Sequence, residues 1–188
     1  GTGSVIVNAG TWDCQGDLTL NNPYGGAATF TNKGTFKKSA GTGTTTIADP
    51  FNNAGSVQAQ TGTISFSANS THTGSFDGNA GAIAFAGGTH DLNAGTVFTG
   101  STQFSGATVN VNVPVSAVVV TMSNGTLQGA STFTTSGMFT WTGGTMSGTG
   151  STTTNGGLTL SGANTKGLNG GRTLNTPAST TATWSGGS

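Results

Sequence analysis

Short alternations of apolar and small polar residues recur along the 188-residue chain, separated by Gly and Asn. The clearest examples occupy residues 16–20, 43–47, 62–66 and 81–85. In short runs, alternation with a period of two is the pattern of a β-strand that buries one face. The sequence therefore predicts many short strands.

A five-residue motif precedes each of these runs: an Asn, a variable residue, a Gly, a Thr or Ser, and a large apolar residue. Its first position forms a turn column of five residues: Asn8, Asn32, Asn53, His72 and Asn93. Successive copies begin 24, 21, 19 and 21 residues apart. A repeat of about 20 residues predicts a solenoid, in which each repeat forms one coil.

Alignment of the repeats places large apolar residues in two predicted core columns. One column contains Trp12, Val57 and Phe76, and the other contains Leu18, Ile64 and Ile83. A single coil of about 20 residues cannot bury its inward face, but a second coil stacked about 4.8 Å away covers it. We therefore predict an all-β, right-handed parallel β-solenoid with coils of about 20 residues, its handedness following that of parallel β connections. Residues 1–188 are expected to form a single solenoid segment.

The repeat is harder to follow after residue 100. Val alternates with other residues from Val109 to Val115, and a second apolar run, Val118 to Val120, follows. We expect a longer pair of strands here, after which the motif resumes at Asn124.

Composition narrows the choice of partners. Gly accounts for 34 residues, charged residues for 5%, and the formal net charge is zero. Glycine suits the tight bend at each corner, often with a positive φ, and outward Thr and Ser keep the surface polar. With no excess of basic residues and no apolar run of about 18 residues, we expect neither nucleic-acid binding nor membrane insertion.

Candidate catalytic and metal-binding groups are few, so we expect no enzyme activity and no cofactor. The carbohydrate-active enzymes built on β-helices need clustered carboxylates. Here Asp13 and Asp17 flank one core strand, while Asp49, Asp77 and Asp91 are scattered over different repeats. His72 and His90 are expected in a turn and on the surface. Cys14 shares a repeat position with Ala59 and Gly78, so we expect it to point inwards.

Three features suggest surface roles. The cluster of Lys33, Lys37 and Lys38 is expected to solvate one coil. Thr triplets at residues 44–46 and 152–154 suggest outward Thr rows of the kind that bind ice or glycans, but they do not recur at the coil period. The tryptophans Trp12, Trp141 and Trp184 are expected to pack against the solenoid.

Residues 157–165, Gly-Leu-Thr-Leu-Ser-Gly-Ala-Asn-Thr, resemble the strand repeat of autotransporter passenger domains. Residues 30–36 and 51–57 are similar to repeats of large bacterial adhesins of the filamentous haemagglutinin type. These families form rod-like β-helices outside the cell, so the resemblance implies a secreted or cell-surface location in a bacterium.

The ends of the chain carry no visible capping sequence, and residues 184–188 read on into residues 1–4 resemble residues 141–151. We therefore expect part of a longer array or a subunit that stacks end to end. Its expected partners are copies of itself or flanking repeats, and surface glycans. The expected function is a structural rod or filament; a glycan- or ice-binding adhesin module is the alternative, and a carbohydrate-active enzyme is less favoured.

Overall fold

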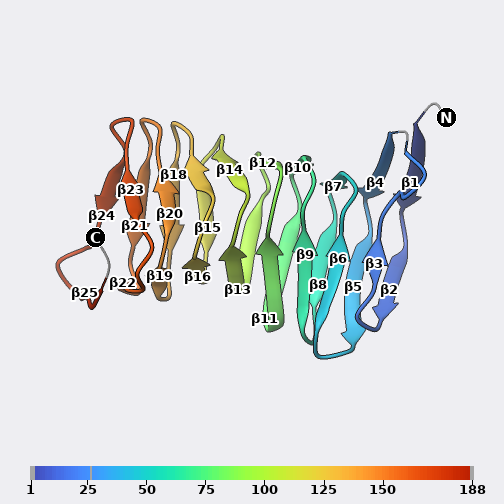
Figure 1. Ribbon diagram of the computed structural model, residues 1–188, viewed down its shortest axis with the longest axis horizontal. Helices are drawn as coiled ribbons and strands as arrows, with labels where there is room; N and C mark the ends of the chain where they lie inside the picture. The colour runs from blue at the N-terminus through green and yellow to red at the C-terminus, as the bar shows by residue number, and fades with distance from the viewer. Residues whose placement is uncertain (1–2, 26, 187–188) are drawn as a thin grey trace.

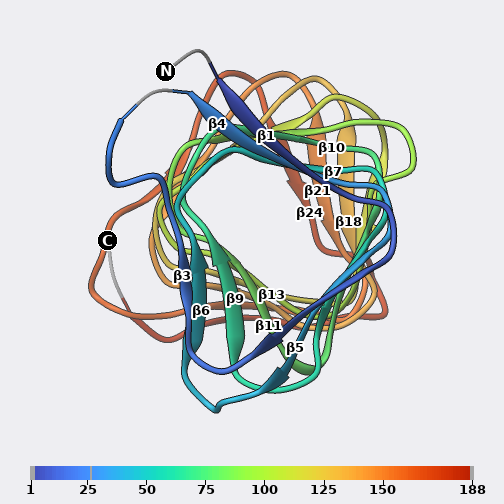
Figure 2. The same cartoon turned by 90° about the vertical axis from the view of Figure 1, so that its right-hand side faces the viewer.

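The computed structural model describes residues 3–25 and 27–186 as one continuous stack of β coils (Figure 1). No helix occurs among these residues. The N-terminal and C-terminal coils lie at opposite ends of the stack (Figure 1). Seen from the N-terminal end, the chain turns clockwise as it recedes, so the solenoid is right-handed (Figure 2).

Each coil contributes strands to three faces, within which neighbouring strands pair in parallel. Face A consists of β1 (Ser4–Asn8), β4 (Ala28–Asn32), β7 (Phe51–Asn53), β10 (Ser70–His72), β12 (Thr89–Leu92), β14 (Thr108–Val111), β17 (Thr126–Gln128), β20 (Gly144–Met146) and β23 (Lys166–Leu168). Face B consists of β2 (Thr11–Gln15), β5 (Thr35–Ala40), β8 (Ser56–Ala59), the first halves of β11 (Ser75–Phe85) and β13 (Val97–Phe104), β15 (Val115–Ala117), β18 (Thr132–Thr135), β21 (Ser151–Thr154) and β24 (Thr173–Asn175). Face C consists of β3 (Thr19–Leu20), β6 (Thr44–Ile47), β9 (Thr63–Phe66), the second halves of β11 and β13, β16 (Val119–Met122), β19 (Phe139–Trp141), β22 (Leu158–Leu160) and β25 (Ala182–Trp184).

The predicted fold class is confirmed. Paired residues in successive coils are commonly 19 apart, as in Asn53 with His72 and Thr89 with Thr108. Because each strand pairs with the equivalent strand one coil away, all three faces keep their side chains in register along the axis.

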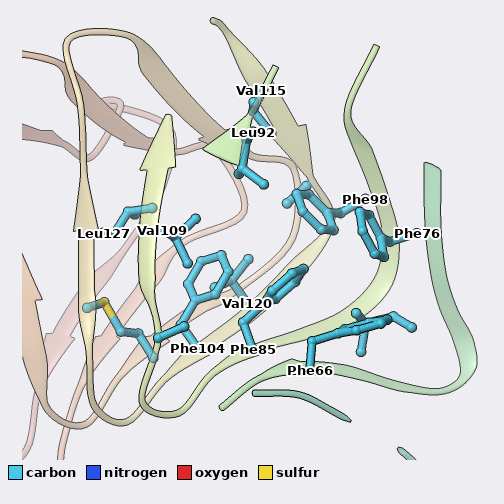
Figure 3. Packing of buried hydrophobic residues seen from close by; sticks show 14 of the residues in the cluster. Phe66, Phe76, Phe85, Leu92, Phe98, Phe104, Val109, Val115, Val120 and Leu127 are labelled. Carbon is cyan, nitrogen blue, oxygen red and sulfur yellow. The ribbon is translucent and has the colours of Figure 1, made fainter. Parts of the chain in front are cut away.

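The core is a stack of aromatic and aliphatic side chains that point inwards from the three faces (Figure 3). The rings of Phe30 and Phe51 stack with centroids 4.9 Å apart, and those of Phe76 and Phe98 with centroids 5.1 Å apart. These four rings are buried, and burying a side chain of this size stabilises the fold by roughly 1.5–3 kcal/mol. Each ring is covered by the coils on either side, so burial depends on stacking.

Motif glycines are required by close approach between coils. A Cβ on Gly34, Gly55 or Gly74 would collide with the carbonyl oxygen of the motif glycine one coil earlier. None of these three has a positive φ, contrary to our expectation for the motif corner. Positive φ occurs at other corners, for example 57° at Gly62 and 81° at Gly125. Glycine therefore permits close backbone stacking at Gly34, Gly55 and Gly74, whereas Gly62 and Gly125 combine a close approach with a left-handed turn.

The region after residue 100 follows the same plan, and the expected long strand pair is wrong. The Val-rich stretch forms three short strands, β14, β15 and β16, one on each face. The turn around Pro114 divides β14 from β15, since proline has no N–H to donate to a strand ladder.

Candidate functional site

The turn column begins as a buried ladder of asparagines. Nδ2 of Asn8 donates to Oδ1 of Asn32 at 2.8 Å, and Nδ2 of Asn32 donates to Oδ1 of Asn53 at 2.9 Å. The same two nitrogens also donate to backbone carbonyls of the next coil: Nδ2 of Asn8 to that of Thr35, and Nδ2 of Asn32 to that of Ser56. The ladder satisfies buried amides and links the corners of successive coils.

His72 continues this column by pairing with Asn53, but Asn93 does not occupy the next position. Leu92 pairs with His72 instead, and Asn93 begins the turn that follows. The turn is longer here, so Val97, the apolar residue of this motif copy, points outwards and Phe98 pairs with Phe76.

The structure brings Trp12, Val57 and Phe76 into one column, with Phe36 between Trp12 and Val57. Val57 and Phe76 are buried, whereas Trp12 lies in the first coil and is 37% exposed. In the second column Ile64 pairs with Ile83 and both are buried. Leu18 lies just before β3 in the first coil and is 51% exposed.

Both histidines are buried, so their expected place in a surface turn is wrong. Their rings stack with centroids 5.3 Å apart, and Nε2 of His72 lies 3.1 Å from Nδ1 of His90. Burial is the main cause that lowers the pKa of His72 to about 3, and the charge of His90 is the second cause. Burial lowers the pKa of His90 to about 4, against the opposing effects of the Gly87 carbonyl and Asp91. Both rings are therefore neutral near pH 7.

Lys38 is also buried and does not solvate the surface as expected. Its Nζ donates to Oδ1 of Asp17 at 2.7 Å and to the carbonyls of Gly16 at 3.0 Å and Ala40 at 2.7 Å. The hydrogen bond from Lys38 is the main cause that lowers the pKa of Asp17. Lys37 lies on the outer side of the same strand, 3.4 Å from Asp13.

The remaining candidates occupy separate places. Cys14 is buried and points inwards, as expected; it pairs with Lys38, which in turn pairs with Ala59 one coil further on. Asp77 lies on face B and Asp91 on face A, so stacking does not bring them together. Among the described residues, no three His, Cys, Asp or Glu side chains lie close enough to hold a metal ion.

Two expectations about surface residues change. In the Thr triplets, Thr45, Thr152 and Thr154 are buried, so these segments are ordinary strands with a polar inward residue. Trp141 is buried as expected, but Trp184 in the last coil is 68% exposed.

The N-terminal coil has an open edge. Within the described residues, β1, β2 and β3 each pair with a strand on one side only. Val5 and Val7 of β1 are exposed, and a hollow of about 150 Å³ beside Ile6 and Leu20 reaches the buried ring of Phe30. This end combines unpaired backbone groups with apolar side chains.

The C-terminal coil has the same character. In the part of the chain that the structure covers, β23, β24 and β25 each pair on one side only. Leu168 is 46% exposed. A hollow of about 260 Å³ lies over the core, and its lining is Trp141, Leu160, Lys166, Leu168, Leu174 and Trp184. Between β23 and β24, Arg172 is buried and donates to Oγ1 of Thr152 and to the Ser151 carbonyl, and burial lowers its pKa to about 10.

Face A carries two regular outward columns that sequence reasoning missed. The threonine column is Thr89, Thr108, Thr126 and Thr145, which pair directly from coil to coil. The amide column is Asp91, Asn110, Gln128 and Ser147, whose side chains are joined by hydrogen bonds. The signal was a Thr followed two residues later by a polar residue, recurring at intervals of 19, 18 and 19 from Thr89, with an apolar residue between them in the last three copies. It lies in the region where the repeat is hardest to follow.

No helix among the described residues is long and apolar enough to cross a membrane. Comparisons with protein-family models, with curated proteins and with solved structures give no match for this chain. The function is therefore inferred from the surfaces of the solenoid.

Proposed function

We propose that this chain is a structural β-solenoid of the bacterial cell exterior, which forms a rod by stacking end to end with copies of itself. The proposal assigns it no catalytic step. The location rests on the resemblance of its repeats to those of autotransporter passengers and filamentous adhesins.

The observation that carries the proposal is that the first and last coils of the described residues present similar surfaces. Within these residues, each has three strands that pair on one side only, and an apolar hollow beside the core. Exposed strand edges of this kind pair readily with other strands, which is why solenoids usually cap them. The last coil of one copy placed on the first coil of another would pair these strands and cover Leu168, Trp184 and Trp12.

Charge does not oppose this contact. The chain has five basic and five acidic residues, so two copies carry no net repulsion. The two ends are different surfaces, and their contact is therefore head to tail. Such a contact propagates into a filament instead of closing as a dimer.

Negative-stain electron microscopy together with sedimentation velocity tests the assembly. We expect filaments of uniform width whose mean length grows with protein concentration. Ile6→Lys at the N-terminal end and Trp184→Lys at the C-terminal end should each give short rods. Val119→Lys is the matched control, since Val119 is 39% exposed in the middle of face C, and it should still form filaments.

Mixing the two end variants gives a sharper result. Each retains one intact end, so an equimolar mixture should form dimers and stop there. Wild-type protein that remains short rods at every concentration would overturn the proposed assembly. Equal loss of filaments in the Val119→Lys control would also contradict it.

The proposed location has a separate test. Protease treatment of intact source cells should release peptides of this chain into the medium. Release only after cell lysis would refute an exterior location.

A further inference from the structure

We infer that face A, from β7 to β23, binds an extended, uncharged polysaccharide along its two outward columns. This inference concerns a side of the solenoid and does not depend on end-to-end assembly.

The first support is that the columns connect two hollows. A hollow of about 340 Å³ includes Thr89 and Asp91, the first members of the two columns. A second, of about 700 Å³, includes Thr145, the last member of the threonine column. These are volumes typical of ligand sites, and the two hollows lie on the same face.

The larger hollow forms where the threonine column is interrupted. Thr145 pairs with Gly167, which has no side chain, so the column opens there into the hollow. Leu168 pairs with Met146, so Asn169, one residue later, continues the amide column. Asn169 also lines the larger hollow. Asn124, Asn164 and Thr165 complete the polar lining.

The second support is that the amide column is held in place before any ligand binds. Nδ2 of Asn110 donates to Oδ1 of Asp91 at 2.7 Å, and Nε2 of Gln128 donates to Oδ1 of Asn110 at 2.9 Å. Oγ of Ser147 donates to Oε1 of Gln128 at 3.4 Å. A side-chain amide has two hydrogens, and each bond uses one of them. Side chains already fixed lose less entropy on binding.

The chemistry of the face selects the partner. Hydroxyls and amides line both hollows, and Asp91 is the one charged residue in their linings. The absence of Lys and Arg from these linings disfavours nucleic acid. Pro50 is the one residue with an apolar side chain in these linings, so they offer no apolar pocket for peptide side chains. A neutral sugar chain offers hydroxyls that both donate and accept, which matches these groups.

The geometry favours a long ligand. Successive rungs are separated by the strand spacing of about 4.8 Å, so six coil steps from Asn52 to Asn169 span about 29 Å. A linear polymer contacts several strands of face A at once, and each further strand that it contacts strengthens binding through effective concentration. Chain length is therefore expected to raise affinity.

Affinity electrophoresis in gels that contain hydroxyethylcellulose, galactomannan or dextran tests the inference. We expect at least one of these neutral polymers to retard the wild-type protein. The triple variant T108A/T126A/T145A should weaken binding about tenfold or more. Polygalacturonate, which is acidic, should bind less well than the neutral polymer.

The matched control is T121A/T140A/T159A, which removes three threonines that pair in the same way on face C. It should bind as the wild type does, and the melting temperature of both variants shows whether they fold. Equal loss in the two variants, or no retardation by any neutral polymer, would overturn the inference. Thermal hysteresis that the face A variant abolishes would overturn it too, because the face would then bind ice.

Discussion

His72 donates from Nε2 to Nδ1 of His90, 3.1 Å away, inside the core of the solenoid. The direction follows from the second contact of His90, whose Nε2 donates to the Gly87 carbonyl at 2.8 Å. Since a neutral imidazole has one donor and one acceptor nitrogen, His90 can accept only at Nδ1. The pair is therefore a chain of two neutral rings in fixed tautomers.

We predict that acid destabilises the fold through this pair. The pKa values of about 3 for His72 and about 4 for His90 lie below the ordinary value of 6.5. The unfolded chain therefore takes up more protons as the pH falls below about 6.5, and the free energy of unfolding falls through this window until the folded values are reached. Each histidine contributes a slope of up to about 1.4 kcal/mol per pH unit. Urea unfolding followed by circular dichroism between about pH 7 and about pH 4 measures it.

The control is the double variant H72N/H90V, which places at these positions the residue types found in the neighbouring coils, Asn53 and Val109. Its stability should vary little over the same window. Asp13 and Asp17 also have lowered pKa values, from Ser39 and Lys38 respectively, but they lose their contribution only below about 3.8. A wild-type profile that is flat between about pH 6.5 and about pH 4, the window in which both histidines contribute, would contradict the prediction.

Gly55→Ala should destabilise the chain by about 2 kcal/mol or more. Its new Cβ would meet the carbonyl oxygen of Gly34, and both coils would have to move apart. Gly10→Ala is the matched control, because Gly10 has the same place in the motif but no atom within 4 Å of its Cβ position. Its effect should be within about 0.5 kcal/mol. Thermal unfolding of the two variants compares them, and similar losses would show that glycine is needed for another reason.

Lys38→Met should cost about 2–4 kcal/mol, because it leaves the Gly16 and Ala40 carbonyls without their buried donor. The neighbouring Lys37→Met removes a partly exposed ion pair with Asp13 at 3.4 Å and should destabilise the chain much less, because solvent screens this pair. Equilibrium unfolding in urea separates the two effects. Equal losses would mean that charge near the first coil, and not burial of Lys38, decides stability.

The thiol of Cys14 should react slowly in the folded chain. It is buried, and burial is the main cause that raises its pKa. We expect a chromogenic disulfide reagent at about pH 8 to modify it about tenfold or more faster in urea than in buffer. Equal rates in the two conditions would show that the first coil opens readily.

The sequence predicted the solenoid because its two patterns, the five-residue motif and the period-two runs, have the same repeat. Columns such as Trp12, Val57 and Phe76 follow from that repeat alone. The Asn93 register could not be predicted, since the longer turn before Phe98 changes which residue points inwards. The buried histidines were missed for a related reason: a motif position that holds Asn in one coil can hold His in another, and both occur in surface turns elsewhere.

Sequence reasoning missed the threonine and amide columns of face A for a different reason. Thr45 is buried, whereas Thr44 and Thr46 on either side of it, and Thr126 of β17, are not. Period-two alternation separates two sets of residues, but it does not say which set faces the core when both contain Thr. The stacking of coils decides this, because the larger side chains fill the common interior.

The motif glycines Gly34, Gly55 and Gly74 each let one coil rest directly on the coil before it. A duplication of about 19 residues inserts one more coil without altering those already present. A duplication taken from the coils that contain Thr108 and Thr126 also adds one threonine and one amide to face A. The length of the rod and the reach of its polysaccharide surface can therefore change together in evolution, in steps of one coil.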